Sequence, residues 1–130
     1  MTVTFIDSSA IVKLIIREEE TRALKRWLAH RDLISSSIAR TEVPRAVWRT
    51  GVKANEPSVR DVLDRIQLLA ADEACLDEAA ALAPASLGSL DAIHLASALM
   101  LGVDVDAFVT YDRSLARAAR VAGLMVEAPT

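Results

Sequence analysis

Short runs of apolar residues alternate along the chain with stretches in which apolar residues recur at helical spacing. The first run, VTFI at residues 3–6, is typical of a buried strand, and Asp7 ends it. Further strands are predicted at residues 32–37 and 106–112, and the segment LMVEAP predicts a last one. Strands that alternate with helices form parallel sheets whose faces the helices cover. The pattern therefore predicts a three-layer α/β/α fold with a central, mainly parallel sheet.

The intervening segments predict helices over residues 10–16, 17–31, 38–51, 59–70, 75–83, 91–101 and 113–123. In the second helix, glutamates lie in the first turn and basic residues in the last, an order that complements the helix dipole. Pro44 predicts that the third helix begins near Thr41 or kinks at the proline. Ser58 and Asp61 have the spacing of a capping box for the fourth helix. The helix over 91–101 is apolar on nearly every face, which indicates a central position.

Composition narrows the class of protein. The 130 residues are expected to form a single domain, and the 52% hydrophobic and 25% charged shares are typical of a globular protein. A net charge of -3 argues against a protein that binds nucleic acid through a general basic field. An enzyme that gathers carboxylates and holds phosphate through a cation stays compatible with that charge.

The single cysteine and the N-terminal residues indicate the cellular compartment in which the protein is expected. Cys75 stands alone, which excludes an internal disulfide and a cysteine metal cluster, and it is expected to be a small core residue in a reducing setting. No cationic region precedes the first apolar run, and Asp7 interrupts that run, so no signal peptide is predicted. The longest weakly polar stretch, residues 92–103, is too short to span a bilayer. We therefore expect a cytoplasmic protein without a membrane segment.

Four acids stand at junctions between predicted elements: Asp7, Glu42, Asp91 and Asp112. Ligands of open α/β sheets bind beyond the carboxyl ends of the strands, where helix N-termini also favour negative charge. Taken singly, each aspartate could be a helix cap. Taken together, crowded carboxylates destabilise one another unless a cation lies among them, and hard oxygen ligands suit Mg²⁺ or Mn²⁺. Such a centre would generate a hydroxide nucleophile and neutralise a phosphodiester.

Four segments resemble one known family. FIDSSAIVKL, the glutamate in IARTEVPRAV, LDAIHLASAL and VTYDRSLARAAR resemble the PIN domain and, more closely, the VapC-type toxins of bacterial VapBC toxin–antitoxin pairs. The resemblance covers almost the full chain in the same order. It implies a PIN-like nuclease domain over residues 1–130 and a Mg²⁺-dependent endoribonuclease in which Mn²⁺ is expected to substitute. It also implies a cognate VapB-type antitoxin that inhibits the enzyme, and a homodimer.

The resemblance implies roles for individual residues. Asp7 and Asp91 match the usual metal ligands, and Glu42 and Asp112 would complete the shell or orient the attacking water. Thr110 matches a small polar position that lines the site in this family. Pro44, just after Glu42, is a departure that bears on the orientation of that glutamate.

Other polar residues near these acids have two interpretations each. Arg45 and Arg49 share a predicted helix face with Glu42, either as an edge that binds phosphate or as a solvated face with local ion pairs. Ser8 would hydrogen-bond a site carboxylate or cap a helix. Arg113 would contact RNA phosphate or simply lie at the surface.

Three further side chains favour structural roles. His94 lies on an apolar helix, where a lone histidine is more often a core residue with its hydrogen bonds satisfied than a general base. Trp27 and Trp48 lie on amphipathic helices and are expected to be core or subunit-contact residues rather than platforms for base stacking.

Two other functions remain open from the sequence. FIDSS places an aspartate after the first strand, as in phosphotransferases and phosphatases with an aspartyl nucleophile. That class usually has a second acid two residues later, where this chain has Ser9, and no lysine for phosphate is evident. The other alternative is a non-catalytic α/β binding module in which the four acids only cap helices.

Overall fold

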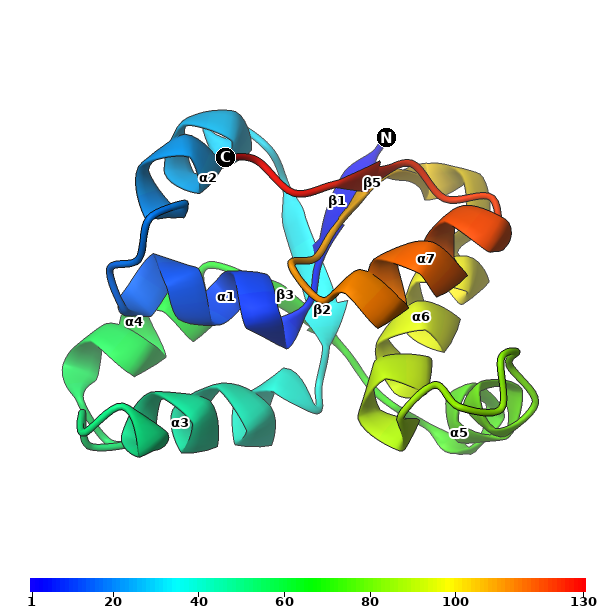
Figure 1. The fold of residues 1–130 in the computed structure, drawn as a ribbon, viewed down its shortest axis with the longest axis horizontal. Helices are drawn as coiled ribbons and strands as arrows, with labels where there is room; N and C mark the ends of the chain where they lie inside the picture. Colours follow the sequence, from blue (N-terminus) through cyan, green and yellow to red (C-terminus); the bar gives the residue numbers. More distant parts are fainter.

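Five parallel strands form the centre of the structure, a computed structural model that describes residues 1–130 (Figure 1). They are β1 (Val3–Ile6), β2 (Leu33–Ser36), β3 (Gln67–Leu69), β4 (Val105–Val109) and β5 (Val126–Glu127). Their order is β3-β2-β1-β4-β5, and all four neighbouring pairs are parallel. Parallel neighbours require crossover connections, which the helices provide.

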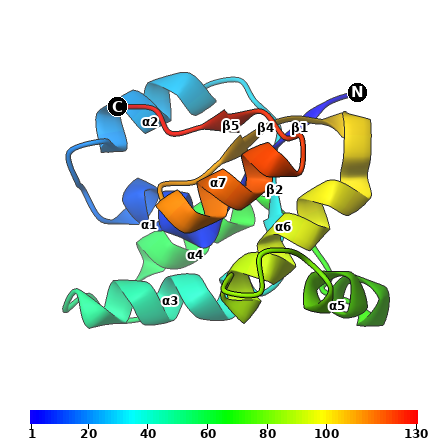
Figure 2. The ribbon, with the colours of Figure 1, turned by 45° about the vertical axis from the view of Figure 1, so that its right-hand side comes forward.

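The helices cover the two faces of this sheet. One group comprises α1 (Ser8–Ile15), α2 (Thr21–Leu28), α3 (Ala39–Arg49) and α4 (Pro57–Asp64). The other comprises α5 (Glu73–Ala80), α6 (Ser89–Leu101) and α7 (Arg113–Val121), with a short 3-10 helix, η1 (Gly102–Asp104), after α6. Figures 1 and 2 show the two groups on opposite sides of the strands. The predicted three-layer α/β/α fold with a parallel sheet is therefore confirmed.

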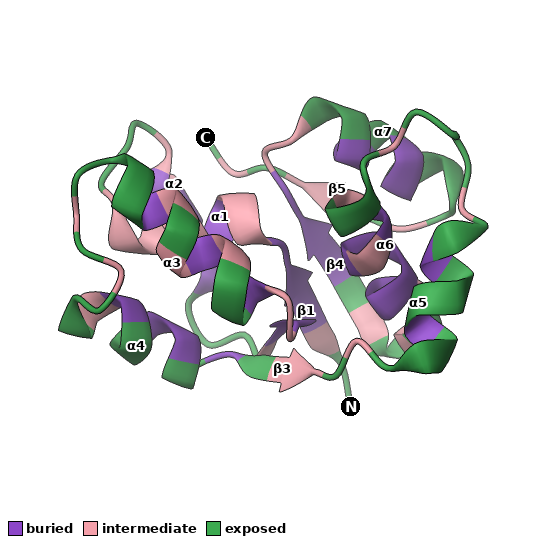
Figure 3. Cartoon of the chain, turned by 90° about the horizontal axis from the view of Figure 1, so that it is seen from below, coloured by how far each residue is buried: buried purple, intermediate pink, exposed green.

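Alternation along β1 divides the core between the two faces. Ile6 packs with the first group of helices and Phe5 with the second, and both side chains are fully buried. The ring of Phe5 stacks on that of Phe108 with 5.2 Å between centroids. Cys75 is 1% exposed and packs with Ala79, Ala92 and Ala96, which confirms its core position. Figure 3 shows the buried residues on the inner faces of the helices and along β1 and β4.

Three predicted features of the helices are wrong. The helix predicted over 59–70 ends at Asp64, because the following residues pair with β2 and form β3, with Ile34 opposite Gln67. The capping box at Ser58 is absent, since Glu56 is the N-cap residue and Pro57 already lies in the first turn. The glutamates predicted inside the first turn of α2 precede it, and Glu20 is its N-cap residue.

The helix that contains Pro44 begins before Thr41 and runs through the proline, which excludes a start near Thr41, one of the two alternatives. α3 starts at Ala39, two residues before Thr41, and continues through Pro44 to Arg49. Glu42 lies in its first turn, as expected, so its carboxylate is near the N-terminal end of the helix. No helix of the structure has the length and hydropathy to cross a membrane.

Candidate active site at the carboxyl end of the sheet

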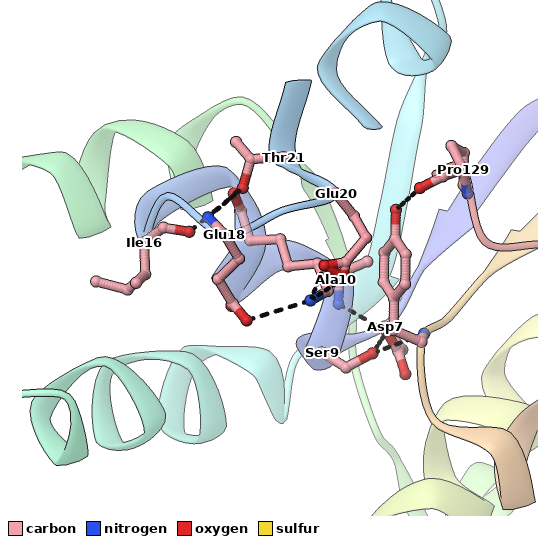
Figure 4. Close-up of polar contacts among 10 residues, drawn as sticks. Asp7, Ser9, Ala10, Ile16, Glu18, Glu20, Thr21 and Pro129 are labelled. Atoms are coloured by element: carbon pink, nitrogen blue, oxygen red, sulfur yellow. Dashed lines mark hydrogen bonds and ion pairs between the residues drawn. The ribbon is translucent and has the colours of Figure 1, made fainter. Parts of the chain in front are cut away.

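Asp7 follows β1 and is only 3% exposed. Its Oδ1 caps α1 by accepting from the backbone N–H of Ala10 at 3.0 Å, and it also accepts from Ser9 Oγ at 2.7 Å (Figure 4). Its Oδ2 accepts from Thr110 Oγ1 at 2.6 Å. Burial raises the pKa of Asp7, while nearby His94 and these hydrogen bonds act in the opposite direction. Asp7 is therefore both a cap and a rigidly oriented buried carboxyl.

Asp112 lies next to Asp7 because β1 and β4 are neighbours and their carboxyl ends meet. The backbone N–H of Asp7 bonds to the carbonyl of Val109, the last residue of β4. Asp112 caps α7 by accepting from the N–H of Leu115 at 2.8 Å. Its own N–H donates to Thr110 Oγ1, whose hydroxyl donates to Asp7. Thr110, 1% exposed, thus links the two acids.

Asp91 belongs to the first turn of α6 but does not cap it. The helix begins at Ser89, its N-cap residue is Gly88, and no side chain caps it. The cap role, one of the two interpretations of Asp91, is therefore excluded. The pKa of Asp91 is raised from 3.8 to about 6, first by burial and then by the charges of Asp112, Asp7 and Glu42. The other three acids, which come from three different helices or helix starts, therefore lie within electrostatic reach of Asp91.

Glu42 faces His94 and Ser8. Its Oε1 lies 2.8 Å from His94 Nε2 and accepts from Ser8 Oγ at 2.7 Å. These hydrogen bonds lower the pKa of Glu42 in spite of its partial burial, which alone would raise the pKa. Ser8 therefore makes the carboxylate contact that was one of its two predicted roles.

His94 is buried as predicted, at 2% exposed, but it is not a satisfied core histidine. It touches the acid cluster through Nε2, and its Nδ1 has no hydrogen-bond partner. Sequence reasoning missed this contact because Glu42 lies 52 positions away. It also missed Ser9, whose only signal was its place two residues after Asp7.

A hydrogen-bonded network supports Asp7 from behind. Ser9 Oγ, besides donating to Asp7, accepts from the N–H of Tyr111 at 3.1 Å. The Tyr111 hydroxyl donates to the carbonyl of Pro129, and Lys13 Nζ lies 4.8 Å from the centre of the Tyr111 ring. Lys13, a buried residue, also pairs with Glu20 at 3.0 Å and with Glu18 at 3.3 Å. The position of Asp7 is thus tied to the loop before α2 and to the C-terminal segment, residues that Figure 4 draws together.

A groove of about 260 Å³ lies beside Glu42, between α1, α3 and the start of α6. Arg45, Arg49, Thr41 and Leu90 line it together with Ser8 and Ser9. Neither arginine forms an ion pair, so the predicted local pairing on this face is absent. Both guanidinium groups are exposed and open to an anionic ligand beside the acids.

Arg113 and the two tryptophans are the remaining candidates from the sequence. Arg113 is exposed as the first residue of α7, directly after Asp112. Trp48 is 60% exposed, which excludes the core role that was one of its two expectations. Trp27 is partly buried against the first core cluster, and the guanidinium carbon of Arg31 lies 3.7 Å from the centre of its ring.

The donor chemistry of this site fits a hard divalent cation. Four carboxyl groups supply oxygen ligands, and Asp91 carries a raised pKa that a cation among the acids would relieve. No three His, Cys, Asp or Glu side chains are arranged to hold one ion together. Mg²⁺ usually keeps several of its waters and binds through one or two carboxylates, so it does not require three direct protein ligands. The residues present therefore fit Mg²⁺ or Mn²⁺.

Comparisons with known proteins agree on one family. The sequence matches the PIN domain family over residues 4–121. It is 45% identical over 131 residues to Ribonuclease VapC46 of Mycobacterium tuberculosis, covering 100% of both chains. It is 37% identical to Ribonuclease VapC47 of the same species, covering 96% of each.

Two solved structures share the fold. VapC20 of Mycobacterium tuberculosis, a sarcin–ricin loop cleaving toxin, superposes with a TM-score of 0.74 at 14% identity, covering 97% of this chain and 99% of that one. A chain of VapBC2 from Rickettsia felis, bound to a DNA fragment from their promoter, superposes with a TM-score of 0.71 at 17% identity. That match covers 99% of this chain and 100% of the other.

Proposed function

Since this chain belongs to the PIN domain family and, within it, to the VapC ribonucleases, we propose that it is a divalent-metal-dependent endoribonuclease. It hydrolyses RNA phosphodiester bonds at the site formed by Asp7, Glu42, Asp91 and Asp112. The observation that carries this proposal is the environment of Asp91. Its carboxyl caps nothing, yet it is held half-buried beside three other acids, and burial together with their charges raises its pKa to about 6. A fold that retains such repulsion is expected to offset it with a bound cation.

Each acid has a role in this proposal. Asp7 and Asp91 would hold Mg²⁺, for which Mn²⁺ substitutes, while Glu42 and Asp112 complete the shell or orient the attacking water. A cation bound there lowers the pKa of a coordinated water and neutralises charge on the phosphodiester. Ser9 and Thr110 fix the orientation of Asp7 through one oxygen each, at 2.7 and 2.6 Å. Asp112 is oriented by its hydrogen bond to the helix it caps.

Three arginines near the acids would bind the RNA phosphates on either side of the cleaved bond. Arg45 and Arg49 line the groove beside Glu42, and neither has a carboxylate partner. Arg113 follows Asp112 on the other side of the site. Guanidinium groups bind phosphate oxygens through paired hydrogen bonds. These three residues would therefore align the RNA so that one phosphodiester lies at the carboxylates.

The partners follow from the same family assignment. We propose that the protein is the toxin of a type II toxin–antitoxin pair, a homodimer held inactive by a cognate VapB-type antitoxin. One structural neighbour is a VapBC complex. Because the substrate is RNA, the proposed location is the cytoplasm.

The two alternative functions explain less of the geometry. The aspartyl-nucleophile class usually has a second acid two residues after the first, but this position is Ser9, whose hydroxyl donates to Asp7 Oδ1. Lys13, the nearby lysine on α1, is paired with glutamates and is not free for phosphate. A module with purely structural caps accounts for Asp7 and Asp112. It leaves Asp91 without a role.

The test is cleavage of a single-stranded RNA by the purified protein with Mg²⁺ or Mn²⁺. We expect internal cuts that stop on addition of EDTA and that are lost in Asp7→Asn and Asp91→Asn. The matched control is Asp77→Asn, which removes one exposed carboxylate on α5, a helix that contributes none of the four acids. Cleavage of equal rate in all four proteins would contradict the proposed site.

A further inference from the structure

We infer that His94 is a positioning residue for the reaction proposed above: its Nε2–H holds the Glu42 carboxylate at the acid cluster. The inference depends on the proposed function, and it adds a residue that the acidic quartet does not include. His94 lies on α6 one turn after Asp91, whereas Glu42 lies on α3. A single rigid helix would then set the positions of two of the four acids, one directly and one through a hydrogen bond.

The contacts of His94 are all on its Nε2 side. Nε2 lies 2.8 Å from Glu42 Oε1 and 3.0 Å from Ser8 Oγ. Ser8 Oγ in turn donates to the same Oε1 at 2.7 Å. The three polar atoms form a closed triangle in which Glu42 receives two donors. Its carboxylate therefore has one well-defined orientation.

The same geometry determines which ring nitrogen carries the proton. An ionised carboxylate only accepts hydrogen bonds, so Nε2 must donate. Nδ1 is buried and has no partner. A proton on Nδ1 would be a buried donor without an acceptor, which is unfavourable. Of the two tautomers, the one with hydrogen on Nε2 is therefore the one that the structure favours.

A purely structural role for His94 explains only part of this environment. The ring packs edge-on against Phe5, with 6.0 Å between centroids, as an apolar side chain of similar shape would. Packing accounts for the burial of His94. It does not account for a nitrogen aimed at a carboxylate of the site, because Leu or Phe would fill the same volume without it.

The first experiment compares His94→Gln with His94→Leu. Glutamine carries an amide N–H2 at about the reach of Nε2, whereas leucine fills space without a donor. We expect single-turnover RNA cleavage in Mg²⁺ to fall about tenfold or more in His94→Leu, the effect of losing one hydrogen bond to a charged group. His94→Gln should recover most of that loss. Leu95→Val, a change at the neighbouring buried residue, which packs in the core cluster of Phe5 and Phe108, controls for altered stability.

A double-mutant cycle then asks whether His94 acts through Glu42. In a Glu42→Gln background, His94→Leu should change the cleavage rate by less than about twofold, since the acid that His94 holds is already gone. Independent, multiplying effects of the two substitutions would overturn the positioning role. So would wild-type rates in His94→Leu measured well below its melting temperature.

An NMR measurement tests the hydrogen bond between His94 and Glu42 independently of catalysis. Long-range ¹H–¹⁵N correlation spectra of the full chain at pH 7.5 should show a protonated Nε2 and an unprotonated Nδ1 for His94, with a changed Nε2 shift in Glu42→Gln. Protonation on Nδ1, or no response to Glu42→Gln, would contradict the inference. Absence of RNA cleavage by the wild-type protein would instead contradict the proposed function, so the two failures are distinguishable.

Discussion

Replacement of Asp91 by asparagine should stabilise the metal-free protein while it abolishes catalysis. Asparagine has nearly the same shape as aspartate but no charge, and Asp91 makes no cap that asparagine would have to replace. A pKa raised from 3.8 to about 6 corresponds to about 3 kcal/mol between the charged and neutral forms. Because Asp91 is only half-buried, solvent screening reduces the expected gain in the free energy of unfolding to about 1 kcal/mol. For a chain of this size that is about 3 to 5 °C in melting temperature.

The pH dependence of this effect has a definite sign. The pKa of Asp91 is higher in the folded than in the unfolded state, so the folded protein binds more protons between pH 3.8 and about 6. The stability of the wild-type protein therefore falls through this window as the pH rises. Above about pH 6 the ionised carboxyl exerts its full repulsion, and below 3.8 it is neutral in both states. The stability of Asp91→Asn should therefore exceed that of the wild-type protein by the full amount at pH 7.5, and the difference should vanish near pH 3.5.

The assay is thermal or urea unfolding of both proteins in EDTA at these two pH values, with cleavage of RNA measured in parallel. Added Mg²⁺ should raise the melting temperature of the wild-type protein but not that of Asp91→Asn, since only the former binds the ion. Asp77→Asn, with the same change in net charge, should alter neither quantity. An equal stability difference at pH 7.5 and pH 3.5 would refute ionisation of the half-buried carboxyl as its source, and retained cleavage would refute the assignment of Asp91.

Three further predictions concern the other residues of the site. Arg45→Gln combined with Arg49→Gln should raise KM for RNA about tenfold with little change in kcat, and KM should depend less on salt concentration. Steady-state kinetics at several salt concentrations test this, and a change confined to kcat would argue against phosphate binding. Asp112→Asn should keep the helix cap, whereas Asp112→Ala should lower the free energy of unfolding by about 1 kcal/mol, measured in urea. Both variants should lose RNA cleavage, and an active Asp112→Asn protein would show that Asp112 serves only as a cap. Thr110→Val removes the 2.6 Å hydrogen bond to Asp7 and should weaken Mn²⁺ binding about tenfold by calorimetry, so unchanged affinity would contradict its supporting role.

The positions of Asp7 and Asp112 were predictable from the sequence for a physical reason. Each follows a strand, and carboxyl ends of parallel strands meet at one edge of a sheet, so two acids 105 positions apart had to converge once β1 and β4 were neighbours. Asp91 was predicted in the correct helix, but the helix starts two residues earlier, at Ser89. The alternative in which Asp91 caps this helix is therefore excluded, while its place near the other acids did not depend on the exact start of the helix.

Two features were not predictable from local pattern. Leu69 continues the helical spacing of the apolar residues of α4, yet it pairs with Ser36 of β2, because hydrogen bonding to a neighbouring strand outweighs the local preference. The spacing of apolar residues on α6 placed His94 in the core, and its burial is confirmed. Its contact with Glu42 joins two helices that no periodicity relates, so only the folded structure brings these side chains together.

The claim that the site of four acids binds a divalent cation for RNA cleavage is tested most directly by cleavage rates measured against Mg²⁺ concentration. An end-labelled, unstructured RNA is incubated with the wild-type protein, Asp7→Asn, Asp91→Asn and Asp77→Asn. We predict saturable dependence on Mg²⁺ for the wild-type protein and Asp77→Asn, and cleavage at least about a thousandfold slower in the two site variants, a loss of about 4 kcal/mol of transition-state stabilisation. Cleavage that persists in EDTA, or that proceeds at the wild-type rate in Asp7→Asn and Asp91→Asn, would contradict it.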